Sequence, residues 1–233
     1  YQRRVRGMQQ LNQNLQISFI SDTHKKHREV TNDLKGGDIL IHTGDISSHI
    51  KYVSTMLIVK DFVEWLSELP YTYKIFIGGN HDFALQKNDE AVHKLCKEYS
   101  NIYYLNNELL TLTIHNQKVK IFGQPQLTTQ DMTKGWAFTY DTQEEVDVFR
   151  KLLVPCDILL THCPPSQCGT LQQFVKQNKI KIHAYGHYHE WYGYECKNGT
   201  HYINGSILDH ENKYSNKPIT IVWNVETNVM SKK

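Results

Sequence analysis

The chain has 233 residues, of which 39% are hydrophobic and 21% are charged, and its formal net charge is only +2. This composition is typical of globular proteins, and the length is sufficient to bury a core without disulfides or a structural metal. The near-balance of charges disfavours a polybasic nucleic-acid binder, and no nucleic-acid-binding patch is evident. No apolar run approaches the length of about 18 residues that a membrane span requires.

The first residues are polar and lack the apolar stretch of a secretory signal. Residues 1–14 are interpreted as an N-terminal extension or a cloning remnant, and residues 15–230 as a single domain. Five cysteines without a C-x-x-C pair indicate reduced thiols rather than a disulfide framework. We therefore expect a cytoplasmic protein.

Short β-rich runs alternate with longer helical patterns along the chain. Buried or alternating apolar runs predict strands at 15–21, 38–42, 73–77, 102–105, 109–114, 118–122, 157–161, 181–186, 201–203 and 219–223. Helical spacing of apolar residues predicts helices at 52–69, 89–99, 144–153 and 169–178.

The spacing of these elements indicates how they are connected. Between residues 102 and 122 the intervals are too short for crossover helices, so these strands are expected to pair antiparallel. Strands 201–203 and 219–223 are also expected to be antiparallel. The mixture of strands and helices predicts an α/β protein with two packed sheets covered by helices on both sides.

Five of the predicted strands end in segments rich in Asp, His and Asn. The segments are S-D-T-H at 21–24, H-T-G-D at 42–45, G-G-N-H-D at 78–82, His162 after strand 157–161, and G-H-Y-H at 186–189. In α/β sheets, ligands bind beyond the carboxyl ends of the strands, so these side chains can converge on one site.

Such a cluster has the donor chemistry of a metal centre. Imidazole and carboxylate groups suit divalent Zn, Mn, Fe or Ni. Alternate residues of an extended strand point to opposite faces, so both members of a D-x-H or H-x-H pair can ligate only where the backbone curls at the strand end. There are enough ligands, with Asp45 as a candidate bridge, for two ions about 3.5–4 Å apart.

The order D-x-H, G-D, G-N-H-D, H and G-H-x-H resembles the calcineurin-like metallophosphoesterases. Further tracts resemble the narrower branch of small metallophosphoesterase-domain-containing proteins related to the fetal-brain protein 239: T-H-C-P-P at 161–165, G-H-Y-H-E-W-Y at 186–192, N-G-S at 204–206, and W-A-F at 136–138 after G-Q-P at 123–125. The resemblance extends from about Ile17 to Ile207. It implies a four-layer α/β/β/α sandwich of two mixed β-sheets, with the site at the strand ends.

The resemblance also implies a role for each residue of the motifs. One metal would be held by Asp22, His24, Asp45 and His189, and the second by Asp45, Asn80, His162 and His187. His81 would be the catalytic residue beside the leaving oxygen, and Asp82 would orient the imidazole of His81. Further candidates for substrate contact are His27, Trp136 and Trp191.

The function implied is hydrolysis of phosphate esters, with diesters preferred, by in-line attack of a hydroxide that bridges two metal ions. Mn²⁺ is the favoured metal, and Fe, Zn and Ni remain alternatives because they share these ligands. The expected partner is a small phosphate ester, with a nucleotide as one candidate. The sequence leaves the physiological substrate, the pathway and the oligomeric state open.

Two alternatives remain at this point. The first is a phosphomonoesterase or protein phosphatase on the same metals; the residues Phe83-Ala84-Leu85, where larger protein phosphatases carry an arginine, disfavour protein dephosphorylation. The second is a weakly active metal-binding scaffold. The presence of His81 in the G-N-H segment favours the enzyme.

Overall fold

The structure is a computed structural model that describes residues 14–50, 53–127, 135–140, 142–167 and 169–233. Its first sheet has the strand order β12-β11-β1-β2-β3-β4. These strands are β1 (Asn14–Ile20), β2 (Gly37–His42), β3 (Tyr71–Phe76), β4 (Ile102–Tyr104), β11 (Ile219–Asn224) and β12 (Val229–Lys232). Strands β1 to β4 run parallel, and β11 and β12 add an antiparallel edge.

The second sheet has the order β5-β6-β7-β8-β10-β9. Its strands are β5 (Glu108–Ile114), β6 (Gln117–Gln124), β7 (Ile158–Thr161), β8 (Ile182–Tyr185), β9 (Gly193–Lys197) and β10 (Thr200–Asn204). The four central strands are parallel, whereas β5 and β9 pair antiparallel at the two edges. Both sheets are therefore mixed, as the sequence predicts.

The core between the two sheets is built from every second residue of their central strands. On the first sheet it includes Ile17, Ile39 and Ile75, which are at most 1% exposed. On the second sheet it includes Ile121 and Ile158, which are completely buried. Because side chains alternate across a strand, the residues between them face outward toward the helices.

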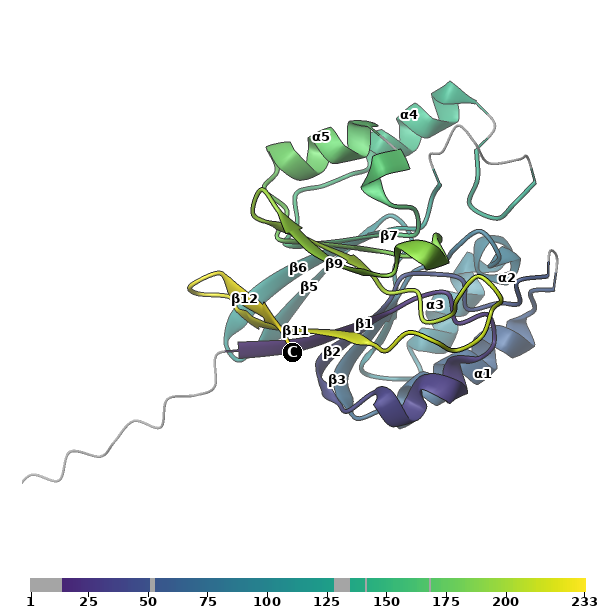
Figure 1. Cartoon of the computed structure of the whole chain (residues 1–233). Helices are drawn as coiled ribbons and strands as arrows, with labels where there is room; N and C mark the ends of the chain where they lie inside the picture. Colours follow the sequence, from purple (N-terminus) through teal and green to yellow (C-terminus); the bar gives the residue numbers. More distant parts are fainter. Residues whose placement is uncertain (1–13, 51–52, 128–134, 141, 168) are drawn as a thin grey trace, which may run out of the picture.

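Helices cover both outer faces and complete four layers (Figure 1). The first sheet packs against α1 (Met56–Glu68), α2 (Phe83–Lys87) and α3 (Asp89–Cys96), and the second packs against α4 (Gln143–Lys151) and α5 (Gly169–Gln177). Short 3-10 turns occupy His27–Asp33, Pro165–Gln167 and His189–Trp191. The expected α/β/β/α sandwich is confirmed.

Several local expectations are wrong. The strand expected at 102–105 pairs parallel with β3 in the first sheet, so it does not continue antiparallel into β5. The strands expected at 201–203 and 219–223 lie in different sheets, where each has its own antiparallel neighbour. Helix α2 and strands β9 and β12 were not expected at all.

The ends of the described chain differ slightly from expectation. Residues 1–13 of the expected N-terminal extension lie outside the described residues, while Asn14 already belongs to β1. At the other end, β12 continues to Lys232. No helix in the described ranges combines the length and apolar character needed to cross a membrane.

The two sheets meet at the carboxyl ends of their central strands. Ser21, directly after β1, forms a parallel β-bridge with Ser206, which follows β10 of the other sheet. The amide of Ile207 donates to the carbonyl of Ser21 at 3.1 Å. Segments that leave β1, β2, β3, β7 and β8 are thereby brought to one place.

Candidate metal centre

Seven side chains that the sequence singles out as ligands come from five of these strand ends. They are Asp22 and His24 after β1, Asp45 after β2, Asn80 after β3, His162 after β7, and His187 and His189 after β8. All five segments leave parallel strands, so their side chains reach the same edge of the sandwich. Asp22 and His162 are completely buried there.

The backbone at this edge is held in an unusual conformation. Four of the seven residues have a positive φ: 54° at Asp22, 41° at His24, 60° at Asp45 and 70° at His187. L-residues rarely adopt this region, and such conformations persist only where the surrounding structure enforces them. The curl that the D-x-H and H-x-H spacing requires is therefore present at both places.

Two glycines allow the segments to approach closely. A Cβ atom on Gly79 would collide with Oδ1 of Asp45, and one on Gly186 would collide with Oδ2 of Asp22. Any side chain at either position would push a carboxylate out of the cluster. The glycines of the G-N-H and G-H-x-H segments thus serve the packing of the site.

The ligating atoms form two overlapping groups. Asp22, His24 and His189 offer three atoms within 4.8 Å of one another, and Asp22, Asp45 and His162 offer a second such set. Nε2 of His189 lies 3.5 Å from Oδ1 of Asp22, and Nε2 of His162 lies 3.3 Å from Oδ2 of Asp45. Nε2 of His24 lies 3.9 Å from the same oxygen of Asp45.

Asn80 and His187 complete the cluster on the side of His162. Oδ1 of Asn80 lies 3.0 Å from Nε2 of His162 and 3.0 Å from Nδ1 of His187. The backbone N–H of His187 donates to both carboxylate oxygens of Asp22, at 3.1 and 3.0 Å. The structure therefore brings all seven side chains together.

Three of the imidazoles are oriented by backbone carbonyls. Nδ1 of His24, His162 and His189 lies 3.0, 2.8 and 2.9 Å from the carbonyl oxygens of Ser47, Thr43 and Asp209, respectively. Since a carbonyl only accepts, each Nδ1 carries a proton, and each Nε2 faces the carboxylates, where it can hold a second proton or, in its place, a metal ion. Histidine ligands of metals are commonly fixed in this way.

The charges of the cluster also suit a bound cation. Burial opposes ionisation of both carboxylates, but nearby imidazoles outweigh it. Contacts with His189 and His162 hold the pKa of Asp22 below its ordinary value. Contacts with His162 hold the pKa of Asp45 below its ordinary value. Burial lowers the pKa of His162 and His189, but their carboxylate partners outweigh it and raise both to about 9. Buried carboxylates and inward-facing imidazoles thus form a donor set that fits two divalent ions.

His81 lies beside the cluster and not within it. Its backbone N–H donates to Oδ1 of Asp45 at 2.8 Å, and its Nε2 is 4.0 Å from Oδ2. Its ring packs 4.6 Å from that of Trp136, centroid to centroid. Nδ1 is buried and has no hydrogen-bond partner among the described residues. The two ring nitrogens thus differ: Nε2 faces the carboxylate of Asp45, and Nδ1 is shielded from solvent.

The expected contact between Asp82 and the imidazole of His81 is wrong. The Asp82 carboxylate is fully buried and accepts hydrogen bonds from four backbone N–H groups instead. Its Oδ2 accepts from Asp45, Ile46 and Gly79 at 2.8, 3.3 and 2.9 Å. Its Oδ1 accepts from Ser47 at 2.8 Å. Asp82 thereby ties the segment after β2 to the segment after β3, and acts as a positioning residue for Asp45.

The three candidates for substrate contact have different surroundings. His27 is only 1% exposed, and its ring packs on Phe62 and Trp65 of α1. This buried position does not support the expected contact between His27 and substrate. Trp136 lies against His81, at the site. Trp191 is 47% exposed and follows the segment that carries His189.

Sequence reasoning missed several supporting groups. The hydroxyl of Ser206 donates to Oδ2 of Asp22 at 2.8 Å, although the N-G-S tract was noted only as part of a resemblance. The carbonyls of Thr43, Ser47 and Asp209 orient the imidazoles, and backbone atoms leave no signature in the sequence. Only the folded chain reveals them.

Comparison with known proteins agrees with this geometry. A family model described as calcineurin-like phosphoesterase matches residues 15–191. Metallophosphoesterase domain-containing protein 1 of Homo sapiens is 31% identical, over 87% of this chain and 69% of its own length. A UPF0046 protein of Caenorhabditis elegans is 27% identical, over 86% of this chain and 78% of its own length.

Solved structures show a similar fold. The crystal structure of a Thermus thermophilus protein superposes with a TM-score of 0.62 and 11% sequence identity, covering 94% of this chain and 98% of that chain. At this identity the likeness concerns the fold alone.

Proposed function

The chain belongs to the calcineurin-like phosphoesterase family, and on that basis we propose that it is a metal-dependent phosphoester hydrolase that prefers diesters. The observation that carries the proposal is the convergence of seven candidate ligand side chains, two of them buried carboxylates, with His81 alongside. Family membership supports a dinuclear centre, and the two overlapping ligand groups are consistent with it.

The proposed ligand sets follow the two sides of the cluster. One ion would be held by Asp22, His24, Asp45 and His189, and the other by Asp45, Asn80, His162 and His187. The short distances from His189 to Asp22 and from His162 to Asp45 support this division. Asp45 is proposed as the shared ligand because its Oδ2 faces both His24 and His162.

Two bound divalent ions would supply Lewis acidity, which lowers the pKa of water and stabilises negative charge on a phosphoryl group. His81 would hold a proton at the oxygen that leaves phosphorus. Trp136 packs on the His81 ring and limits its rotation. Asp82 holds the loop of Asp45 through three backbone N–H groups, so the Asp45 carboxylate stays in place.

The arginines of the described residues support the preference for diesters. Both arginines in the described residues bind surface carboxylates: Arg28 pairs with Asp61 and Glu68, and Arg150 pairs with Asp147. Guanidinium groups are the usual bidentate partners of a phosphate dianion. A phosphodiester carries one negative charge, so it needs less such neutralisation than a monoester.

Aromatic side chains at the site suit an aryl or nucleobase substituent on the phosphate. Trp136 lies beside His81, and the exposed ring of Trp191 stacks on Tyr188 with centroids 4.5 Å apart. Flat apolar rings of this kind bind other rings by stacking. A nucleotide therefore remains one candidate for the substrate.

The test is a metal-reconstitution assay. Metal-stripped protein is reloaded separately with Mn²⁺, Ni²⁺, Zn²⁺ and Fe²⁺, and turnover of bis(4-nitrophenyl) phosphate is compared with that of 4-nitrophenyl phosphate. We expect metal-dependent turnover that is highest with Mn²⁺ and faster on the diester. A faster monoester reaction would make the protein a phosphatase, and no turnover with two ions bound would indicate a scaffold.

A further inference from the structure

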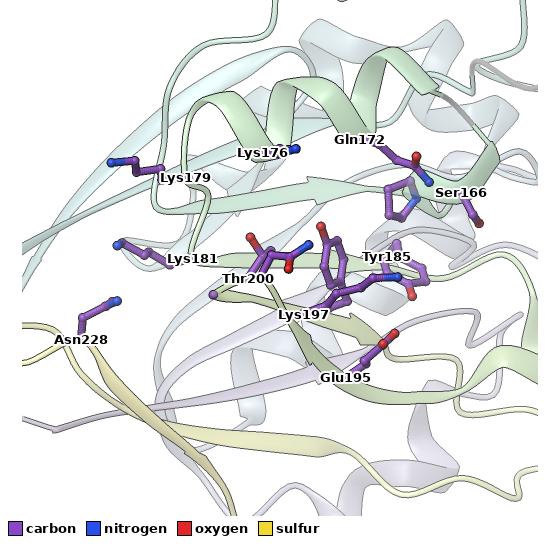
Figure 2. A pocket seen from close by; sticks show the side chains of 14 residues that line it. Ser166, Gln172, Lys176, Lys179, Lys181, Tyr185, Glu195, Lys197, Thr200 and Asn228 are labelled. Atoms are coloured by element: carbon purple, nitrogen blue, oxygen red, sulfur yellow. The ribbon is translucent and has the colours of Figure 1, made fainter.

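A cavity lies away from the predicted ligands, on the outer face of the second sheet (Figure 2). It has a volume of about 870 Å³ and lies between α5 and the strands β8, β10 and β9. Four of the side chains around it are lysines: Lys176, Lys179, Lys181 and Lys197. We call this cavity the lysine groove. None of the seven proposed metal ligands lines it.

The positive charge of the lysine groove is poorly compensated. Glu195 is the one acidic residue in its lining, and among the ion pairs of the described residues none involves any of the four lysines. The groove therefore carries more positive charge than the +2 of the whole chain. Such concentration in a concave surface raises the local concentration of anions.

Helix stability accounts for only part of this arrangement. Lys176 lies in the last turn of α5 and Lys179 just after it, where cations favour the helix dipole. Lys181 immediately precedes β8, and Lys197 ends β9, so neither belongs to a helix terminus. These two lysines lie at the ends of different strands and line the same cavity, which points to a ligand.

The remaining lining is polar and suited to hydrogen bonding. Figure 2 shows Tyr185, Thr200 and Gln172 around the cavity, together with Ser166 at one end. Thr200 is buried, and its hydroxyl donates to the carbonyl of Ile180 at 2.7 Å, which fixes the floor of the groove. Hydroxyl and amide groups beside lysines match the oxygens of an anion and the polar body attached to it.

We propose that the lysine groove is a binding site for a small ligand with several linked phosphates, distinct from the metal centre. Lysine binds phosphate as a point charge, and four lysines spread along one cavity suit a chain of phosphates better than a single one. A volume of about 870 Å³ is within the range of small-molecule sites. The phosphates can belong to an inorganic polyphosphate or to a nucleoside polyphosphate.

Calorimetric titration of the full chain with inorganic tripolyphosphate tests the proposal. EDTA in the buffer removes metal-mediated phosphate binding, so the result is independent of the proposed hydrolase activity. We expect saturable binding of one equivalent. The double variant Lys181→Ala/Lys197→Ala should bind about tenfold or more weakly, which corresponds to the loss of charge-assisted contacts.

The matched control is Lys94→Ala/Lys118→Ala, which removes the same charge from exposed lysines outside the groove and should leave binding unchanged. A parallel titration with a nucleoside triphosphate identifies the source: tighter binding than tripolyphosphate means that the groove also recognises the nucleoside. The proposal is overturned if neither ligand binds in EDTA, or if both double variants weaken binding equally. It is also overturned if a single-stranded oligonucleotide binds and tripolyphosphate does not displace it.

Discussion

Replacing His81 by alanine is expected to reduce kcat by about 10²- to 10⁴-fold on a diester whose leaving alcohol is weakly acidic. The imidazole lies beside the cluster, 4.0 Å from Asp45, and its buried Nδ1 is unpartnered among the described residues. Its loss removes the proton donor for the departing oxygen but none of the proposed ligands. Metal content, measured by mass spectrometry of the digested protein, should remain at two ions per chain.

The leaving group makes this prediction specific. Nitrophenolate departs readily without protonation, so the H81A variant should lose much less activity on a nitrophenyl ester than on an alkyl ester. His93→Ala serves as the control, because His93 lies on α3 beside surface carboxylates and should leave both rates unchanged. Loss of metal from the H81A variant, or an equal loss of rate on both esters, would show that His81 does not act as a general acid.

Replacing Asp45 by asparagine is expected to weaken binding of both metal ions more than about 100-fold, since even indirect partners of a metal typically change its affinity 10- to 100-fold. Asparagine keeps the size of the side chain but removes the charge from the proposed shared ligand. Asp22→Asn should weaken one ion much more than the other. Isothermal titration with Mn²⁺ distinguishes loss of both ions from loss of one, because it measures the number of ions bound per chain.

A charge-matched control for these variants is Asp61→Asn, which alters a surface carboxylate paired with Arg28. It should retain two ions and full activity. Asp22 belongs to both of the compact ligand groups, so Asp22 is the other candidate for the shared ligand. Loss of both ions from the D22N variant, with only one lost from D45N, would make Asp22 the bridging ligand and overturn our assignment.

The strands that deliver the site are those that the sequence predicts best. β1, β2, β7 and β8 are short, mostly buried segments rich in apolar residues, because both faces of a central parallel strand are covered. The edge strands β9 and β12 carry exposed polar side chains and resemble loops in the sequence. β4 has only three residues, and its pairing with β3 depends on a contact that the intervals along the chain do not reveal.

The candidate site, like the strands, could be predicted from the sequence only in part. The curled strand ends place Asp22, His24 and His187 where the motif spacing predicts. The partners of His27 and Asp82 could not be inferred, because they depend on contacts between distant segments. His27 packs against rings of α1, and Asp82 accepts N–H groups from the loop after β2.

We propose that two metal ions bind at the joined carboxyl ends of the two sheets. Anomalous diffraction from crystals of the full chain grown with Mn²⁺ tests it directly. We expect two peaks about 3.5–4 Å apart, one bounded by His24 and His189 and the other by Asn80 and His162, with Asp45 between them. A single peak, or peaks outside this cluster, would contradict a dinuclear centre.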